Sequence, residues 1–141
     1  MLSLGVCIGS SNISYVLTSR EDSRTRTLAS DSIIHEGNPG RIIKDLFNSD
    51  RFKGTTRLCV TGRKFRHFLD APSISEPEAI ELAYGSIEKE LPSDVIISAG
   101  AETVMVYRLT KDGRIEDVMT GNKCASGTGE FFLQQLRLRV Q

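Results

Sequence analysis

The sequence has no long apolar run and no excess of charge of either sign. Its 18 lysine and arginine residues balance 18 aspartate and glutamate residues, so no basic surface is expected to hold a nucleic acid. No apolar stretch approaches the roughly 20 residues of a membrane span, and the N-terminus lacks the basic region of a signal peptide. These absences predict a cytoplasmic protein whose partners are neither nucleic acid nor membrane.

Cysteine and histidine are also scarce. The three cysteines, Cys7, Cys59 and Cys124, are an odd number, lie far apart and include no CxxC pair. This spacing argues against both a disulfide framework and a self-contained zinc site, which leaves at most one cysteine for chemistry. The two histidines, His35 and His67, have no evident partners in the sequence, so we expect both on the surface.

The first part of the chain is typical of a three-stranded meander. Apolar stretches predict strands at 2–9, 13–17 and 25–34, with polar and charged turns between them. Apolar residues at helical spacing then predict a short amphipathic helix around residues 42–47. A fourth strand is expected at Arg57–Thr61, and the crossover before it makes this strand parallel to the first.

The second part begins with a helix and then repeats the meander. A serine, acids and a proline near the first turn predict a helix over residues 75–91. Three further strands are expected at 94–98, 103–109 and 115–119, the last two joined by a hairpin turn. Apolar residues then recur on a predicted helix at 127–141.

The order of these elements is one and a half copies of the same unit. A three-stranded meander followed by a helix is similar to each lobe of the actin-like ATPases, whose lobes are RNase H-like sheets. The sequence therefore predicts an α/β chain with the actin-like ATPase (RNase H-like) fold, with the first lobe at residues 1–92 and the beginning of a second lobe at 93–141. Because half a lobe would expose apolar surface, we expect the chain to be part of a longer protein.

The most specific motif is the block Asn122–Phe131, which reads Asn-Lys-Cys-Ala-Ser-Gly-Thr-Gly-Glu-Phe. It resembles the cluster-bearing loop of the BadF/BadG/BcrA/BcrD-type ATPases, a family that includes the activators of 2-hydroxyacyl-CoA dehydratases and of benzoyl-CoA reductases. The resemblance implies that Cys124 is a ligand of an iron–sulfur cluster shared across a homodimer, next to Gly127, Thr128 and Gly129. A helix N-terminus favours the thiolate that binds iron, which agrees with this role. The alternative is a glycine-rich turn that caps a helix, with Cys124 as an ordinary small residue.

The number of cysteines limits what this chain holds by itself. A 4Fe-4S cluster normally takes four thiolates, so a symmetric dimer needs two cysteines from each chain. In the family the second ligand lies further along than Gln141, and Cys7 and Cys59 fall in predicted strands. The 4Fe-4S cluster is therefore expected in a full-length dimer and not in this chain alone.

The first nucleotide motif of the family is a strand reading roughly Gly-Ile-Asp-Val-Gly-Ser-Thr, followed by a turn that holds phosphate. This chain has Gly5-Val6-Cys7-Ile8-Gly9-Ser10-Ser11 in its place. Gly9, Ser10 and Ser11 keep the small residues that let backbone amides approach a phosphate. Cys7 replaces the aspartate that holds the water shell of magnesium, and a neutral thiol does not suit that hard cation. A plain strand–turn–strand explains the segment equally well.

The second phosphate motif, typically Asp-x-Gly-Gly-x-Asp, is expected at residues 97–102. Gly100 keeps the turn and Glu102 keeps an acid, whereas Ile97 replaces the first aspartate. The resemblance thus implies ATP or ADP with magnesium as the ligand, while the replaced aspartates predict impaired hydrolysis.

Two weaker candidates lie elsewhere in the chain. Thr61-Gly62-Arg63 resembles a turn that faces the nucleotide in the family, and a strand-ending turn explains it as well. Glu78 and Glu81 are one helical turn apart, a spacing that favours a solvated acidic face over a role in the site.

The leading interpretation is an ATPase-family domain of a CoA-enzyme activase that is impaired in ATP hydrolysis. In this family, ATP binding is coupled to the transfer of a low-potential electron to a partner iron–sulfur enzyme, a dehydratase or a reductase. The alternative is a non-catalytic copy of the domain that serves as a structural or partner-binding module beside a sister domain. The loss of both aspartates favours the alternative, and the intact block Asn122–Phe131 favours the activase.

Overall fold

The computed structural model describes residues 1–22, 24–62, 66–87 and 89–121, and the chain divides into two compact units, Met1–Glu76 and Pro77–Gln141. The division falls near the start of the helix that the sequence assigned to the first lobe, so this helix groups with the second sheet instead. In the described part of the chain, no helix is long and apolar enough to cross a membrane.

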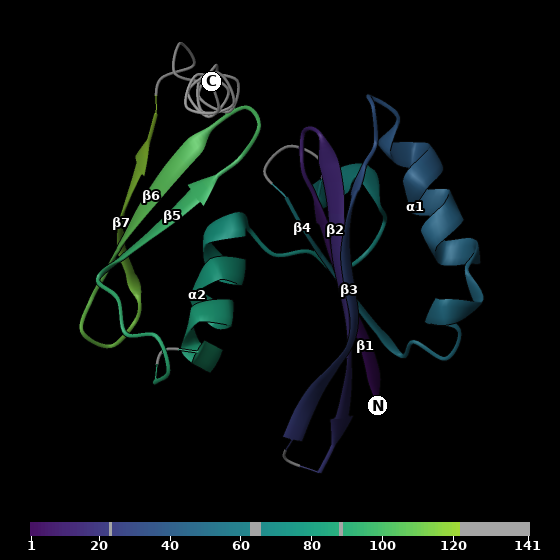
Figure 1. Cartoon of the computed structure of the whole chain (residues 1–141), viewed down its shortest axis with the longest axis horizontal. Helices are drawn as coiled ribbons and strands as arrows, with labels where there is room; N and C mark the ends of the chain where they lie inside the picture. The colour runs from purple at the N-terminus through teal and green to yellow at the C-terminus, as the bar shows by residue number, and fades with distance from the viewer. Residues whose placement is uncertain (23, 63–65, 88, 122–141) are drawn as a thin grey trace, which may run out of the picture. The chain divides into compact units, whose positions relative to one another are not determined.

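The first unit is a four-stranded sheet with α1 (Pro39–Asn48) packed on one face (Figure 1). Its strands are β1 (Leu2–Ile8), β2 (Asn12–Glu21), β3 (Arg24–Ile34) and β4 (Arg57–Thr61), in the spatial order β3-β2-β1-β4. The first three strands pair antiparallel, and β4 pairs parallel with β1. The predicted meander and its parallel fourth strand are confirmed.

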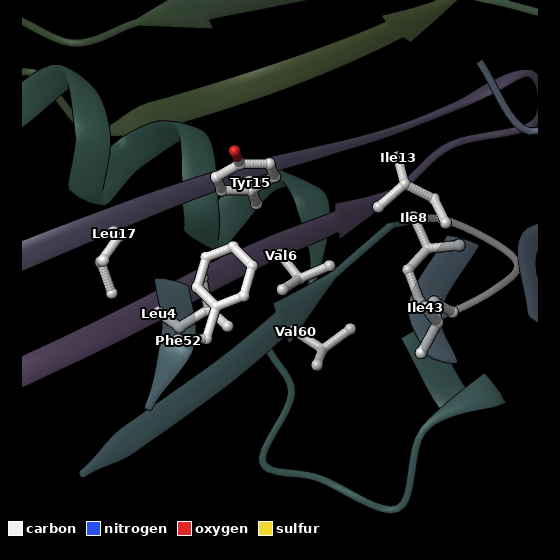
Figure 2. Close-up of a cluster of buried hydrophobic side chains, with 9 residues drawn as sticks. All are labelled: Leu4, Val6, Ile8, Ile13, Tyr15, Leu17, Ile43, Phe52 and Val60. Atoms are coloured by element: carbon white, nitrogen blue, oxygen red, sulfur yellow. The ribbon is translucent and has the colours of Figure 1, made fainter. Parts of the chain in front are cut away.

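Alternating side chains give this sheet one apolar face. Successive strand residues point to opposite sides, so the apolar residues of β1 and β2 gather on the side that α1 covers. The buried cluster consists of Leu4, Val6, Ile8, Ile13, Tyr15, Leu17, Ile43, Phe52 and Val60 (Figure 2). Burying each large aliphatic side chain contributes roughly 1.5–3 kcal/mol, so this cluster is the main source of stability in the first unit.

Local signals fix the start of α1. Asn38 caps the helix, because its Oδ1 accepts a hydrogen bond from the backbone N–H of Arg41 at 3.1 Å. Pro39 then fills the first turn, where a missing N–H costs nothing. After the helix, the short 3-10 turn η1 (Asp50–Phe52) places Phe52 against Tyr15, with ring centroids 5.1 Å apart in an edge-to-face contact.

The segment after β4 returns along the outer edge of that strand. It passes through the 3-10 turn η2 (Arg66–Phe68). The N–H of Val60 then donates to the carbonyl of Pro72, and the N–H of Ile74 donates to the carbonyl of Val60, both at 2.9 Å. These bonds cover the edge of β4 beside its most buried residue.

The second unit is a three-stranded antiparallel sheet with α2 (Glu76–Ile87) beside it (Figure 1). Its strands are β5 (Val95–Ala99), β6 (Val104–Leu109) and β7 (Ile115–Thr120), in that spatial order. Met105, Tyr107 and Leu109 of β6 are buried, as is Tyr84 of α2. The Tyr84 hydroxyl donates to the carbonyl of Ser93 at 3.0 Å and accepts from its N–H at 2.8 Å, which ties α2 to the start of β5.

Gly62, directly after β4, lies very close to the end of β1. Its φ is +128°, and a Cβ added there would lie 2.3 Å from the carbonyl oxygen of Ile8. We expect Gly62→Ala to lower the free energy of unfolding by more than about 1 kcal/mol, because the new methyl group would push β4 away from β1. Chemical denaturation followed by circular dichroism measures the change.

Gly85 provides the matched control for this prediction. It lies inside α2, and a Cβ there would meet nothing within 4 Å. Gly85→Ala should therefore raise stability by up to about 1 kcal/mol, because alanine favours the helix. Equal effects of the two substitutions would contradict the close approach of β4 to β1.

Candidate phosphate-binding turns

Both meanders begin with a strand that ends in the same kind of turn. After β1, the N–H of Gly9 donates to the carbonyl of Asn12 at 2.9 Å. After β5, the N–H of Gly100 donates to the carbonyl of Thr103, also at 2.9 Å. Each bond spans three residues and joins the end of one strand to the start of the next, so Gly9 and Gly100 occupy equivalent positions in the two units.

The turn after β1 is tightly closed and lies at the surface. Ser11 is exposed, and Gly9 and Ser10 are partly exposed. A Cβ at Gly9 would lie 3.0 Å from both the backbone oxygen and the side-chain oxygen of Asn12. Glycine therefore allows the chain to fold back here, and the small residues leave the backbone of the turn accessible to a ligand.

The turn after β5 is also accessible. Gly100, Ala101 and Glu102 are exposed, and Thr103 is partly exposed. The predicted residues of each motif, Gly9 to Ser11 in one unit and Gly100 to Glu102 in the other, thus lie together in a turn. Neither turn carries a bulky apolar side chain.

Small polar side chains form a row across the first sheet beside its turn. Strand pairing sets Ser32, Ser14, Cys7 and Thr61 side by side on β3, β2, β1 and β4. They lie on the face opposite the apolar core, because each alternates with core-facing residues in its own strand. This face carries hydroxyl and thiol groups at the level where the other face carries aliphatic side chains.

The two ends of this row differ in their hydrogen bonds. Ser14 Oγ lies 3.0 Å from Ser32 Oγ, and Asn12 Nδ2 donates to Ser32 Oγ at 2.5 Å. At the other end, Thr61 Oγ1 is buried and has no hydrogen-bond partner among the described residues. An unsatisfied buried hydroxyl costs about 1–3 kcal/mol, so a polar group that reached Thr61 would be stabilised there.

The residues of this row do not suit magnesium. That ion prefers hard oxygen ligands and is usually held through carboxylates. Cys7 offers a thiol at the central position. In the part of the chain that the structure describes, no group of three His, Cys, Asp or Glu side chains is placed to hold a metal ion.

In the second unit, the equivalent of Cys7 is Ser98 and not Ile97. Cys7 precedes Gly9 by two residues, and Ser98 precedes Gly100 by two. The motif resemblance places the aspartate of the family at Ile97, but Ile97 is 66% exposed and lies on the opposite face of β5 from Ser98. Counting back from each turn glycine would have found Ser98. The carboxylate is nevertheless missing from both positions.

The prediction that His35 is a surface residue is wrong. His35 is only 6% exposed, and its Nε2 lies 3.2 Å from the carbonyl oxygen of Gly9. Its Nδ1 accepts a hydrogen bond from the N–H of Gly37 at 3.1 Å. No residue pattern indicates this role, because both partners of the ring are backbone groups. His67 is exposed, as predicted.

Glu81 belongs to the packing of the second unit and not to a solvated acidic face. Its Oε2 accepts the backbone N–H of Ile115 at 2.8 Å, and its Oε1 lies 3.8 Å from Arg114 Nη1. The first bond joins α2 to the start of β7. Glu78, one turn earlier, is exposed.

The remaining predicted site residues lie outside the described part of the chain. These are the proposed cluster ligand and its loop, together with the last residue of the turn after β4: Cys124, Gly127, Thr128, Gly129 and Arg63. Their roles stay predictions.

Each unit is a meander whose first strand ends in a turn that begins with glycine. This repeated arrangement is the actin-like ATPase fold, and it defines the class of this chain. A Bacteroides thetaiotaomicron protein with this fold and of unknown function matches 99% of the chain at 8% identity, with a TM-score of 0.56, and the match covers 77% of that structure. The predicted fold is confirmed.

Two of the solved structures with higher TM-scores come from CoA dehydratase systems. The activator of the 2-hydroxyisocaproyl-CoA dehydratase from Clostridium difficile, solved with bound ADPNP, matches 100% of the chain at 24% identity with a TM-score of 0.71. Component A of the (R)-2-hydroxyglutaryl-CoA dehydratase from Acidaminococcus fermentans matches 93% of the chain at 21% identity with a TM-score of 0.66. At these identities the likeness establishes the fold. The chain spans about half of these structures, 53% and 51% respectively.

One curated relative shares part of the sequence. An uncharacterized protein of Methanocaldococcus jannaschii is 31% identical over 71 residues, which are 50% of this chain and 29% of the relative. No protein-family model matches the sequence. The function must therefore be argued from the turns and their surroundings.

The role of Glu81 leads to a prediction about stability. We expect Glu81→Ala to destabilise the second unit by about 1 kcal/mol, because the N–H of Ile115 would lose its acceptor. Glu81→Gln is the matched control, since it keeps a side-chain oxygen and removes only the charge. Amide hydrogen exchange at Ile115 measures the effect directly. Equal loss of protection in both variants would show that the ion pair with Arg114, and not the hydrogen bond, holds α2 to β7.

Proposed function

We propose that this chain is the nucleotide-binding part of an actin-like ATPase of the dehydratase-activator type, impaired in ATP hydrolysis. The observation that carries the proposal is the repeated turn, with Gly9 and Gly100 in equivalent positions after the first strand of each meander. The solved activator with bound ADPNP supports an adenine nucleotide as the ligand. The activator systems among the structural neighbours support the activator type.

Each turn suits a phosphate group for the same physical reason. A turn of small residues lets a phosphate approach the backbone, whose N–H groups are the natural donors to its oxygens. In the first turn these residues are Gly9, Ser10 and Ser11, and the serine hydroxyls add donors. In the second turn the small residues are Gly100 and Ala101, and the acid Glu102 stands close to the second carboxylate position of the family motif.

Impaired hydrolysis follows from the side chains that precede the turns. Hydrolysis in this class depends on a magnesium ion whose water shell is organised by carboxylates. Cys7 and Ser98 stand at the two equivalent positions, and neither a thiol nor a hydroxyl is a good anchor for that ion. We therefore expect the chain to bind the nucleotide but not to hydrolyse it rapidly.

The activator type further implies a role in electron transfer. In this proposal, Cys124 is one ligand of a 4Fe-4S cluster shared by two chains of a homodimer, and the loop with Gly127, Thr128 and Gly129 surrounds it. The partner would be a cytoplasmic iron–sulfur dehydratase or reductase that accepts the electron. The support is the resemblance of the block Asn122–Phe131 to the family loop.

A second candidate function is a non-catalytic copy of the domain that binds a sister domain or another partner. The observation that favours it is the absence of a carboxylate at both Cys7 and Ser98. A copy that had lost nucleotide binding altogether would not need small residues in the two turns. The two candidates therefore differ in whether the turns bind phosphate.

Calorimetric titration of ATP and ADP into the full chain, with and without magnesium, separates the two candidates. We expect the wild-type chain to bind nucleotide with nearly the same affinity in both conditions, because neither Cys7 nor Ser98 provides a carboxylate to hold the ion. The Cys7→Asp, Ser98→Asp double variant should gain about tenfold in affinity when magnesium is added.

The matched control for this titration is the Cys7→Asn, Ser98→Asn double variant, which has the same shape without the charge. It should show no dependence on magnesium. Tight binding by the wild type that requires magnesium would contradict the proposed loss of the metal site. No binding by any of the folded proteins would reject nucleotide binding and favour the non-catalytic module.

The cluster proposal leads to a separate prediction. When the chain is reconstituted anaerobically with iron and sulfide, we expect no stable iron–sulfur absorption band, because Cys124 alone would give two thiolates per homodimer where four are normally needed. Cys124→Ser is the control and should behave in the same way. A stable band in the wild type that Cys124→Ser abolishes would show that this chain provides a complete site.

A further inference from the structure

His35 is a buried histidine whose hydrogen bonds lead to the candidate phosphate turn and to the start of α1. Its ring bonds Gly9 through Nε2, and its backbone N–H donates to the carbonyl of Ser11 at 3.0 Å. Its own carbonyl accepts the N–H of Asn38, the cap of α1, at 2.7 Å. One residue thus joins both ends of the turn to the start of the helix.

The hydrogen bonds of the ring define its tautomer. The N–H of Gly37 donates to Nδ1, so Nδ1 carries no hydrogen. Nε2 must then carry the hydrogen, and it donates to the carbonyl oxygen of Gly9. Only the neutral ring with hydrogen on Nε2 satisfies both contacts.

The backbone after His35 is shaped to provide the first of these contacts. Glu36 and Gly37 both have left-handed conformations, with φ of +48° and +81°. Two such residues in succession bend the chain sharply, so the N–H of Gly37 returns to the ring of His35. A left-handed conformation is uncommon for a glutamate, and it persists here because the surrounding bonds fix it.

The bond from His35 to Gly9 also orients the next peptide group. A trans peptide is planar, and its C=O and N–H point in opposite directions. When the ring holds the carbonyl of Gly9 on its own side, the N–H of Ser10 must point away from the ring. The ring therefore determines which way one of the turn's donors faces.

We propose that His35 is a positioning residue for phosphate binding, acting as the neutral Nε2–H tautomer that holds the Gly9–Ser11 turn with the N–H of Ser10 directed toward the ligand. The inference rests on the proposed function, since it assigns the turn a phosphate ligand. His35 does not touch that ligand. It acts through the carbonyl of Gly9.

The first test needs no substitution. Long-range proton–nitrogen NMR of the imidazole ring distinguishes the two neutral tautomers from each other and from the charged ring. We expect His35 to show the Nε2–H form. The Nδ1–H form or the charged ring would overturn the proposal, whether or not the chain binds nucleotide.

The second test uses two variants and a control. His35→Phe removes both ring contacts, and we expect the Kd for ATP to rise about tenfold, as for the loss of one well-placed hydrogen bond. His35→Gln keeps an N–H donor that reaches Gly9, so its Kd should stay within about threefold of the wild type. His67→Phe, on an exposed histidine, should leave the Kd unchanged.

A readout at the turn separates positioning from general stability. The backbone amide resonance of Ser10 should shift in His35→Phe and remain near its wild-type position in His35→Gln. The thermal unfolding midpoints of the two variants show whether either one is generally destabilised. If Ser10 is unmoved in a folded His35→Phe, the proposal is wrong. If Ser10 shifts but the wild type binds no ATP, the positioning of the turn stands and the proposed nucleotide function is the part that fails.

Discussion

The alternation of side chains along β1 is the constraint on which the first unit depends. Leu4, Val6 and Ile8 point into the core, so Cys7 between them must point to the opposite face. A slip of one residue in the pairing with β2 would expose the apolar side chains and bury the polar ones. The same register that secures the core therefore also fixes the polar row and places the turn at Gly9.

Much of the fold could be predicted from the sequence because its signals are local. The strands, the capped helix α1 and the parallel pairing of β4 with β1 follow from apolar periodicity, Asn38-Pro39 and the crossover connection. The grouping of α2 with the second sheet was not predicted. It depends on the bonds of Tyr84 to Ser93 and of Glu81 to Ile115, which join residues 9 and 34 positions apart.

The candidate site was only partly predictable, for the same reason. Gly9 and Gly100 stand out in sequence, because glycine is common in tight turns. His35 could not be assigned, since its ring reaches a carbonyl 26 residues away and a carbonyl has no sequence signature. The family motif has two adjacent glycines, which places its aspartate at Ile97. This chain has one glycine there, and the hydrogen bond of Gly100 sets the register so that Ser98 takes the position.

In the proposed function, the neutral side chains of Cys7 and Ser98 have opposite effects on binding and on catalysis. A carboxylate close to a phosphate repels it, and in a partly buried site this repulsion is large unless a cation lies between them. If only one of the two positions lacked a carboxylate, the remaining carboxylate would still repel the phosphates. The cation that offsets this repulsion would then be held more weakly. With neutral groups at both positions this repulsion is removed together with the metal anchor, and the exposed Glu102 of the second turn remains as a nearby carboxylate. The turn amides then remain as donors to an anion, so nucleotide binding without efficient hydrolysis is consistent with the proposed function.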